Sequence, residues 1–483
     1  MDVLSYYRNS HVRERMIEFM GGKSLDSSTC MFITQCDCES DIGWDLKRPT
    51  ELDFYWSQGL DVSRSLWDKK WLIAHLDIEY VNFDFPAEPY LDPERSFSMQ
   101  RPSVLAIEEF LLGTGIAPLH VLSGRGHHFV WNIDRDSAAF GKLAELGHLP
   151  LHLEKRYAEM LPPVNIPIER DLGAAFAGLA LVMEYVAIMI KDKAELKSLL
   201  PVELSAVEVS PQFRGREMIS IDITEYGDLL NTRLVRIPYS VYLKPWHKIG
   251  DLDDQIKKRI PPMVSVPLFE MDINEGIAAM RDLSKAAELA SRASVQIPDQ
   301  SKQMLDLIRS YETSEIARVH NWFYSEEQQP PEAWPQTYDK LNLDILPPCV
   351  RFVIENPNDL LLKPAGIRQV TRIMLSLGWH PRHIAGLIRS KFERNFGWGR
   401  EWYFYDAATR ADFYTRIFTD LIKTKQDTLK NFDCSSIKKM KFCFNEKADC
   451  DLDLFKKSLS ERVHNERLAC RPFNGLFLPD EHI

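Results

Sequence analysis

Two acidic residues follow an apolar run, and their spacing suits metal chemistry. Leu72–Leu76 is mostly apolar and leads into Asp77 and Glu79. Because residues two apart in a β-strand point to the same face, these carboxylates would lie side by side. Such a pair repels itself unless protons or cations neutralise it, and Mg²⁺ and Mn²⁺ prefer oxygen ligands. A second apolar strand ends in Asp222, and three carboxylates can hold two metal ions for phosphoryl transfer. A solvated strand edge is the alternative.

A turn further along the chain is more specific. In residues 120–131, two apolar strands flank a turn with two glycines, one arginine and two histidines. The glycines permit unusual backbone angles and the close approach of a phosphate, and Arg125 supplies a permanently charged, forked donor. Alternation along the second strand puts His127 and His128 on opposite faces, so only one of them can readily face the carboxylates. A hairpin with incidental polar residues is the alternative.

These motifs resemble the catalytic small subunit of the archaeo-eukaryotic primase (primase-polymerase) superfamily. That family has an acidic pair on a strand, then Ser-x-x-Gly-x-His on a hairpin, then one Asp on a later strand. Here Asp77 and Glu79 form the pair, Ser123 through His128 match the hairpin, and Asp222 is the later Asp. The resemblance implies that Asp77, Glu79, Asp222 and His128 are catalytic. It also implies an α+β domain with an RRM-like core and two Mg²⁺ or Mn²⁺ ions.

The resemblance extends to residues 233–244 and covers about residues 1–250. The family has a basic residue, Pro, an aromatic residue, Ser, Val, His, any residue and Lys in this stretch, and its basic residues contact nucleotide phosphates. Arg236 and Lys244 are therefore expected to bind the nucleotide. They would do so together with the hairpin residues Ser123, Gly124, Arg125 and His128. Tyr242 replaces the usual His, so it is given no role.

One departure concerns zinc. Family members often carry a zinc knuckle between the acidic pair and the histidine, but residues 80–122 hold no cysteine. Cys30, Cys36 and Cys38 lie upstream without an obvious fourth ligand, which favours structural cysteines.

Five cysteines lie in the last part of the chain, at positions 349, 434, 443, 450 and 470. Four thiolates suit zinc or an iron–sulfur cluster, and scattered buried cysteines are the alternative. The spacing alone does not say which cysteine would be left over. The pattern resembles the C-terminal domain of the large primase subunit, which opens with Pro-Pro-Cys and binds a [4Fe–4S] cluster. That resemblance covers about residues 341–455. It implies Cys349, Cys434, Cys443 and Cys450 as ligands of the cluster or of Zn²⁺, with Cys470 as the spare, although Cys450 and Cys470 could exchange roles.

The length of 483 residues suggests two or three domains. Residues 1–265 alternate apolar runs and helical stretches, which predicts the α+β catalytic domain. Residues 266–340 predict a helical segment, with one helix over Ile277–Ala293, and then a Pro-rich linker over Ser325–Gln336. Residues 341–483 predict an all-α domain that carries the four-cysteine site.

Composition fits a soluble globular protein, with 45% hydrophobic and 27% charged residues. The net charge of -11 counts mildly against nucleic-acid binding, although a local groove can still be positive. Residues 173–190 are apolar enough to span a bilayer, but Glu184 lies within them and a buried helix is expected. No signal peptide or secreted disulfide pattern is evident, so a cytoplasmic, nucleoid-associated location without membrane contact is expected.

The resemblance implies a DNA primase or primase-polymerase that makes primers from NTPs or dNTPs by two-metal phosphoryl transfer. Its partners would be a single-stranded DNA template and, as candidates, a helicase or another replication protein. Basic residues between Arg368 and Arg394, followed by Trp398, Trp402 and Tyr403, suit a template strand or equally a solvated helix. Alternatives are a catalytically weak nucleic-acid-binding scaffold and another metal-dependent phosphotransferase such as a nuclease. The choice between ribo- and deoxynucleotides, the cellular role and the oligomeric state stay open.

Overall fold

The computed structural model describes most of the chain. The described residues are 1–35, 46–151, 153, 155, 168–205, 217–227, 234–247, 253–357, 361, 363–394, 406–429, 432–439, 443, 450 and 452–465. They form two compact units. The first contains residues 1–205 and 215–310, and the second includes everything from Tyr311 onward.

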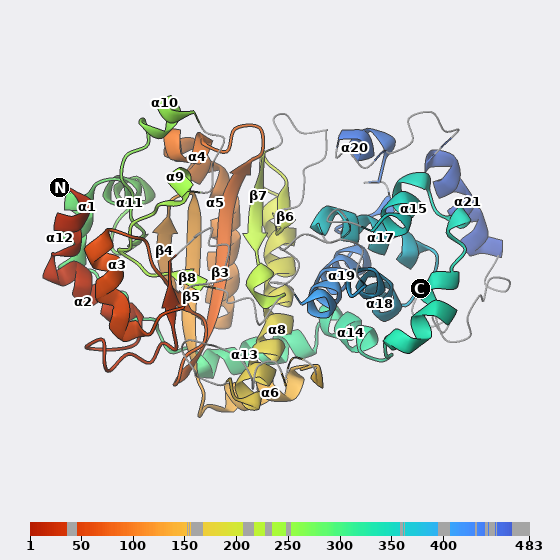
Figure 1. Cartoon of the computed structure of the whole chain (residues 1–483), viewed down its shortest axis with the longest axis horizontal. Coiled ribbons are helices and arrows are strands. Elements are labelled where there is room, and N and C mark those ends of the chain that lie inside the picture. The colour runs from red at the N-terminus through yellow and green to blue at the C-terminus, as the bar shows by residue number, and fades with distance from the viewer. Residues whose placement is uncertain are drawn as a thin grey trace. The chain divides into compact units, whose positions relative to one another are not determined.

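A six-stranded mixed sheet is the centre of the first unit (Figure 1). Its order is β6-β7-β3-β5-β4-β9, and only the β6–β7 pair is parallel. The strands are β3 (Trp71–Asn82), β4 (Leu119–Ser123), β5 (Gly126–Asp134), β6 (Val202–Leu204), β7 (Glu217–Asp222) and β9 (Val266–Pro267). The long strand β3 lies between β5 and β7, so its residues have neighbours on both sides.

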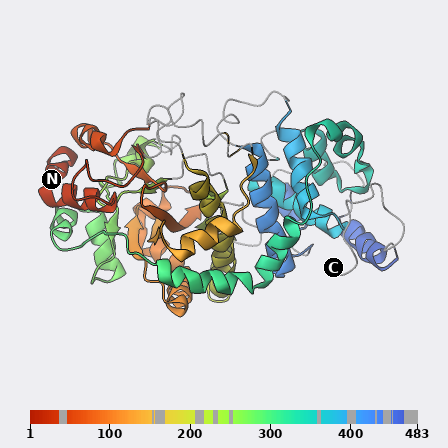
Figure 2. The same cartoon turned by 90° about the horizontal axis from the view of Figure 1, so that it is seen from below.

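Two long helices pack on one face of this sheet. They are α5 (Pro93–Thr114) and α8 (Arg170–Glu195), and they contact each other as well as β3. The shorter α6 (Ala138–Leu146) packs along α8, as Figures 1 and 2 show. The chain thus runs β3-α5-β4-β5-α8-β7, a β-α-β-β-α-β arrangement with both helices on one face.

Alternation along β3 decides what each face of the sheet carries. Its even-numbered residues Leu72, Ala74, Leu76, Ile78 and Tyr80 are all fully buried and form the core beneath the helices. The odd-numbered residues therefore point to the opposite face. Asp77 and Glu79 are among them, so the strand presents its carboxylates away from the apolar core.

Smaller elements complete the first unit. A three-stranded sheet has the order β1-β2-β8, with β1 (Ile33–Thr34), β2 (Ser63–Ser65) and β8 (Leu234–Arg236). The helices are α1 (Val3–Tyr7), α2 (Ser10–Phe19), η1 (Pro49–Glu51), α3 (Leu52–Gln58), α4 (Glu88–Leu91), η3 (Thr224–Tyr226), α9 (Lys244–His247), α10 (Asp254–Lys257), α11 (Ile273–Met280), α12 (Leu283–Ala290) and α13 (Ser301–Glu312).

The segment 266–340 differs from its prediction in three ways. The single helix expected over Ile277–Ala293 is two helices, because Asp282 accepts hydrogen bonds from the backbone of residues 284 and 285 and starts α12 as a new helix. The division between the units falls inside this segment, after Ser310. The expected Pro-rich linker is folded into the second unit, where Trp334 and Tyr338 are buried.

The described regular elements of the second unit are all helical, and the chain as a whole is α+β. The helices are α14 (Glu315–Phe323), η4 (Pro331–Gln336), η5 (Tyr338–Lys340), η6 (Leu343–Ile345), α15 (Pro348–Glu355), α17 (Pro364–Ser376), α18 (Pro381–Phe392), α19 (Ala407–Lys423), α20 (Cys434–Lys439) and α21 (Leu452–Asn465). α17, α18 and α19 pack on one another and form the core of this unit.

Among the described helices, α8 is long and apolar enough to cross a membrane. Its most apolar window is 83% buried within the structure, as expected of the core helix of a soluble protein. Glu184 is itself fully buried on this helix.

Candidate functional site

Strand register brings the predicted carboxylates and the predicted histidine together. Asp77 on β3 lies directly opposite Asp222 on β7 and directly opposite His128 on β5. Directly opposite residues of antiparallel strands share a face, so these three side chains point the same way. Glu79 follows on the same face of β3, opposite Gly126. All four predicted catalytic residues thus lie on one face of three adjacent strands.

The carboxylates differ in how they are neutralised. Burial raises the pKa of Asp77 well above its usual range, and the charges of Glu79 and Asp222 raise it further. Burial alone would also raise the pKa of Glu79, but Arg125 and Lys244 outweigh it and lower that pKa to about 2. Asp77 Oδ1 is buried and accepts no hydrogen bond. A buried carboxylate oxygen without a donor is costly unless a proton or a cation meets it, so this oxygen fits a metal ion.

Two cations lie against Glu79. Arg125 donates from Nη2 to Glu79 Oε2, and Lys244 Nζ lies 3.7 Å from Glu79 Oε1. Both side chains are only about one-fifth exposed, so solvent screens them weakly. Positive charge is therefore concentrated beside the acidic face, which is the combination required to bind a metal-bound polyphosphate.

The two turn glycines are required for packing. A side-chain carbon at Gly126 would lie 1.9 Å from the carbonyl oxygen of Ile78 on β3, and one at Gly124 would lie 2.4 Å from the ring of Tyr242. The sequence assigned Gly124 to the approach of a phosphate, whereas in the structure it admits the Tyr242 ring. Arg125 is fixed by its carbonyl oxygen, which accepts from the backbone of Tyr80 and the side chain of Gln100.

The two neighbouring histidines have different surroundings. His128 Nε2 lies 2.6 Å from Ser123 Oγ, and His128 Nδ1 lies 3.7 Å from Asp77 Oδ1. His127 points to the helix-covered face, where it contacts the ring of Phe97 and the imidazole of His120. Only His128 therefore shares the face of the carboxylates. Burial and the neighbouring His75 hold the pKa of His128 well below its usual range.

Arg236 is engaged by the protein. Its Nη1 contacts Asp61 Oδ2 at 3.0 Å and the carbonyl oxygen of Val241 at 3.1 Å, and its guanidinium lies 4.4 Å from the centre of the Tyr242 ring. Asp61 is fully buried and Arg236 is 9% exposed. The sequence assigned Arg236 to nucleotide phosphates. In the structure its guanidinium contacts Val241 and Tyr242 and so positions the segment that precedes Lys244.

Tyr6 and Tyr7, near the N-terminus, form hydrogen bonds with the same segment that precedes Lys244. The Tyr6 hydroxyl donates to the carbonyl oxygen of Tyr239, and the Tyr7 hydroxyl accepts from the backbone N–H of Val241 and donates to the carbonyl oxygen of Leu60. Tyr239 has a φ of 67°, an uncommon conformation for a tyrosine, so external hydrogen bonds stabilise the bend. These bonds position the chain just before Lys244.

Sequence reasoning missed two residues of this site, His75 and Glu225. His75 Nε2 lies 2.7 Å from His128 Nδ1, and His75 Nδ1 lies 3.1 Å from Glu225 Oε1. The signal for His75 was available, because it precedes Asp77 by two positions and must share its face. Glu225 follows β7 after a turn that no local pattern specified.

Four cysteines of the second unit line one cavity. Cys349 lies in the first turn of α15, Cys434 begins α20, and Cys443 and Cys450 follow in the chain. The space that they line together with Pro348, Ile437 and Leu452 has an empty volume of about 310 Å³, part of it open to solvent. Burial and the nearby Cys450 raise the pKa of Cys349 to about 12, so this thiol would stay protonated unless a cation met it. Cys36, Cys38 and Cys470 lie outside the described residues, and Cys30 is buried in the first unit.

The basic residues between Arg368 and Arg394 that the sequence singled out are engaged in ion pairs. Arg368 and Arg372 contact Asp427, Arg382 contacts Asp412, His383 contacts Glu326, Arg389 contacts Glu393, and Lys391 and Arg394 contact Asp339. These contacts favour a structural role over direct binding of a template. Trp398, Trp402 and Tyr403 lie outside the described residues.

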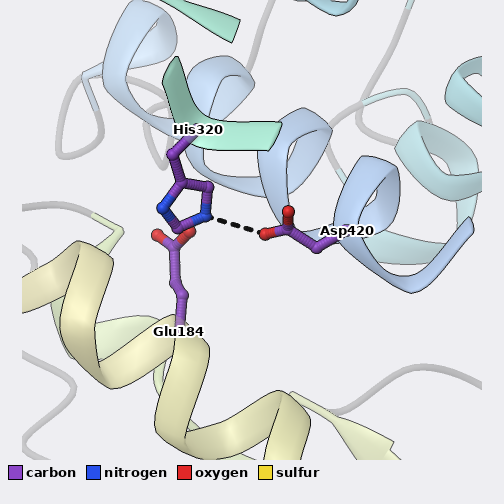
Figure 3. A group of neighbouring side chains, drawn as sticks. All are labelled: Glu184, His320 and Asp420. Carbon is purple, nitrogen blue, oxygen red and sulfur yellow. Dashed lines mark hydrogen bonds and ion pairs between the residues drawn. The ribbon is translucent and has the colours of Figure 1, made fainter. Parts of the chain in front are cut away.

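Figure 3 draws three buried side chains of metal-ligand type, Glu184, His320 and Asp420. His320 Nε2 lies 2.8 Å from Asp420 Oδ2, and His320 Nδ1 lies 2.9 Å from the Tyr311 hydroxyl. The first contact joins α14 to α19 and the second joins α14 to Tyr311 at the end of α13, all within the second unit, whereas Glu184 belongs to α8 of the first.

No protein-family model, curated protein or solved structure matches this chain.

Proposed function

We propose that the first unit is a template-directed nucleotidyl transferase of the primase-polymerase type. The observation that carries the proposal is the register that places Asp77 opposite both Asp222 and His128, with Glu79 on the same face. The β-α-β-β-α-β order with both helices on the far face supports the proposal, because the resemblance implies a core of this kind.

The carboxylates of Asp77, Glu79 and Asp222 would hold two Mg²⁺ or Mn²⁺ ions. Asp77 Oδ1, which is buried and accepts no hydrogen bond, supports this assignment, because a cation would remove the cost of its burial. When bound, such ions lower the pKa of the attacking 3′-hydroxyl and offset the charge on the leaving pyrophosphate.

The remaining residues would bind and orient the triphosphate. Arg125 and Lys244 lie beside Glu79 and can turn toward a polyanion that brings its own metal. Ser123 Oγ can donate to a phosphate oxygen, and so can His128 Nε2 when it carries the imidazole proton. Their contribution is electrostatic and positional, and the loss of one such contact lowers the rate by about 10²–10³-fold.

Primer extension tests this proposal. Purified protein would be incubated with single-stranded DNA, with and without a paired primer, labelled NTPs or dNTPs, and Mg²⁺ or Mn²⁺. The proposal predicts template-directed products that lengthen with time. Shortening of the template strand would instead establish the nuclease alternative, and template binding without any product would favour the scaffold.

A second proposal concerns Cys349, Cys434, Cys443 and Cys450, because all four line one cavity. We propose that they hold a [4Fe–4S] cluster, with Zn²⁺ as the rival ion, since four thiolates suit both. Such a unit would help to hold the first nucleotide during initiation, as the resemblance implies. A site of this kind joins α15 to α20 and so stabilises the second unit.

Metal analysis distinguishes the [4Fe–4S] cluster from Zn²⁺. Anaerobically purified protein should be brown and contain about four irons per chain. Cys434→Ser should lose the metal and impair initiation more than extension of a ready-made primer, whereas Cys470→Ser is the matched control and should keep both. Protein that contains neither iron nor zinc and still initiates normally would contradict the proposal.

A further inference from the structure

A chain of hydrogen-bond contacts leads from the interior to the phosphate-binding hairpin. Glu225 Oε1 lies 3.1 Å from His75 Nδ1, His75 Nε2 lies 2.7 Å from His128 Nδ1, and His128 Nε2 lies 2.6 Å from Ser123 Oγ. His75 and Glu225 are 5% and 6% exposed. In this chain of contacts they reach the hairpin through His128.

The turn after β7 is built around His75. β7 ends at Asp222, opposite Asp77, so the backbone of His75 lies beyond the last β7 pairing. The Tyr226 hydroxyl accepts from the His75 N–H at 2.8 Å and donates to the His75 carbonyl oxygen at 2.7 Å. Two consecutive residues of η3 therefore contact His75. Tyr226 binds its backbone, and Glu225 contacts its imidazole.

This arrangement restricts the His128 ring. A free imidazole can rotate and can carry its proton on either nitrogen, and a hydrogen bond to one nitrogen fixes the role of the other. The contact from His75 occupies Nδ1 of His128, so Nε2 is the nitrogen that faces Ser123 and the hairpin. The rings of His75 and His128 are nearly parallel, with centres 5.0 Å apart, which further limits rotation.

We propose that His75 and Glu225 are positioning residues that hold the His128 imidazole with Nε2 toward a phosphate of the incoming nucleotide. The inference deepens the proposed function and rests on it. His75 acts through His128, and Glu225 acts through His75.

A second histidine pair provides a matched control. His120 Nε2, on β4, lies 2.9 Å from His127 Nδ1 on the opposite face of β5. His127 Nε2 has no hydrogen-bond partner. Removing His120 therefore removes a part-buried histidine contact of the same kind without touching the proposed phosphate site.

A double-mutant cycle tests the inference in the full-length protein. KM and kcat for the nucleotide would be measured by primer extension for His75→Ala, His128→Ala and the double variant. His75→Ala should raise the nucleotide KM on the order of tenfold, and this effect should vanish in the His128→Ala background because the residues act as one unit. His120→Ala should leave KM unchanged. Glu225→Gln, which keeps the side-chain shape if His75→Ala fails to fold, should raise KM in the same direction.

The outcomes separate this inference from the function on which it rests. A wild-type protein that incorporates no nucleotide overturns both. An active wild-type protein in which the His75→Ala and His128→Ala effects multiply, or in which His75→Ala behaves like His120→Ala, overturns the inference alone. So does an active protein whose nucleotide KM is unchanged by His128→Ala.

Discussion

Replacement of Asp427 by asparagine should destabilise the second unit substantially. The Asp427 carboxylate is fully buried, and it contacts Arg368 Nε at 2.8 Å and Arg372 Nη2 at 2.7 Å through both oxygens. Burial alone would raise the pKa of Asp427, but the two guanidinium groups outweigh it and lower the pKa to about 2. Relative to the ordinary value of 3.8, this shift corresponds to about 2 kcal/mol of stabilisation at neutral pH.

The Asp427→Asn variant should lose more than that amount. The neutral amide would leave two largely buried guanidinium groups without a counter-charge, and breaking a buried pair in this way costs roughly 3–5 kcal/mol. For a unit of this size the unfolding temperature should fall by roughly 10 °C. The pH dependence follows from the lowered pKa. The stabilisation is complete above the unfolded pKa near 3.8 and is lost as pH falls toward about 2.

Calorimetry and hydrogen exchange at α17 and α19 would measure the effect in the second unit. Asp344→Asn is the control, because Asp344 is 76% exposed in its contact with Arg351 and should contribute little. A loss below about 1 kcal/mol for Asp427→Asn, or a difference in stability between variant and wild type that stays the same as the pH falls toward about 2, would refute the assignment of Arg368 and Arg372 to structure.

Two further predictions concern the hairpin of the first unit. His128→Ala should lower nucleotide incorporation far more than His127→Ala, because of these two histidines His128 is the one that shares a face with Asp77. Equal losses in steady-state assays would contradict the register. Gly126→Ala should lower both the unfolding temperature and incorporation, since its side chain would lie 1.9 Å from the Ile78 carbonyl oxygen, and a variant with wild-type stability would show that the hairpin can shift.

Local patterns in the sequence predicted the elements that carry the site. Apolar runs indicated the positions of β3, β4, β5 and β7, and the period of two put Asp77 and Glu79 on one face. The pairing of Asp77 with Asp222 was not predictable in this way, because register between distant strands depends on tertiary packing.

The roles of single side chains were harder to predict. Arg236 matched a phosphate-binding pattern, yet its buried partner Asp61 lies far away in the sequence and has no motif of its own. The role of Glu225 likewise could not be predicted from the sequence, because its contact with His75 depends on how η3 packs against β3. The break before α12 was missed because strong helix formers on both sides obscured the capping role of Asp282.

The most direct test of the central claim is nucleotide incorporation by the Asp77→Ala, Glu79→Ala double variant. Labelled NTPs and dNTPs would be supplied with a primed DNA template and Mg²⁺ or Mn²⁺. Glu217→Gln is the control, since this β7 carboxylate contacts Arg95 and lies outside the proposed metal site. We expect a folded double variant without detectable incorporation, beside a Glu217→Gln variant that retains activity. Incorporation by the double variant at the wild-type rate would contradict the assignment of these carboxylates to catalysis.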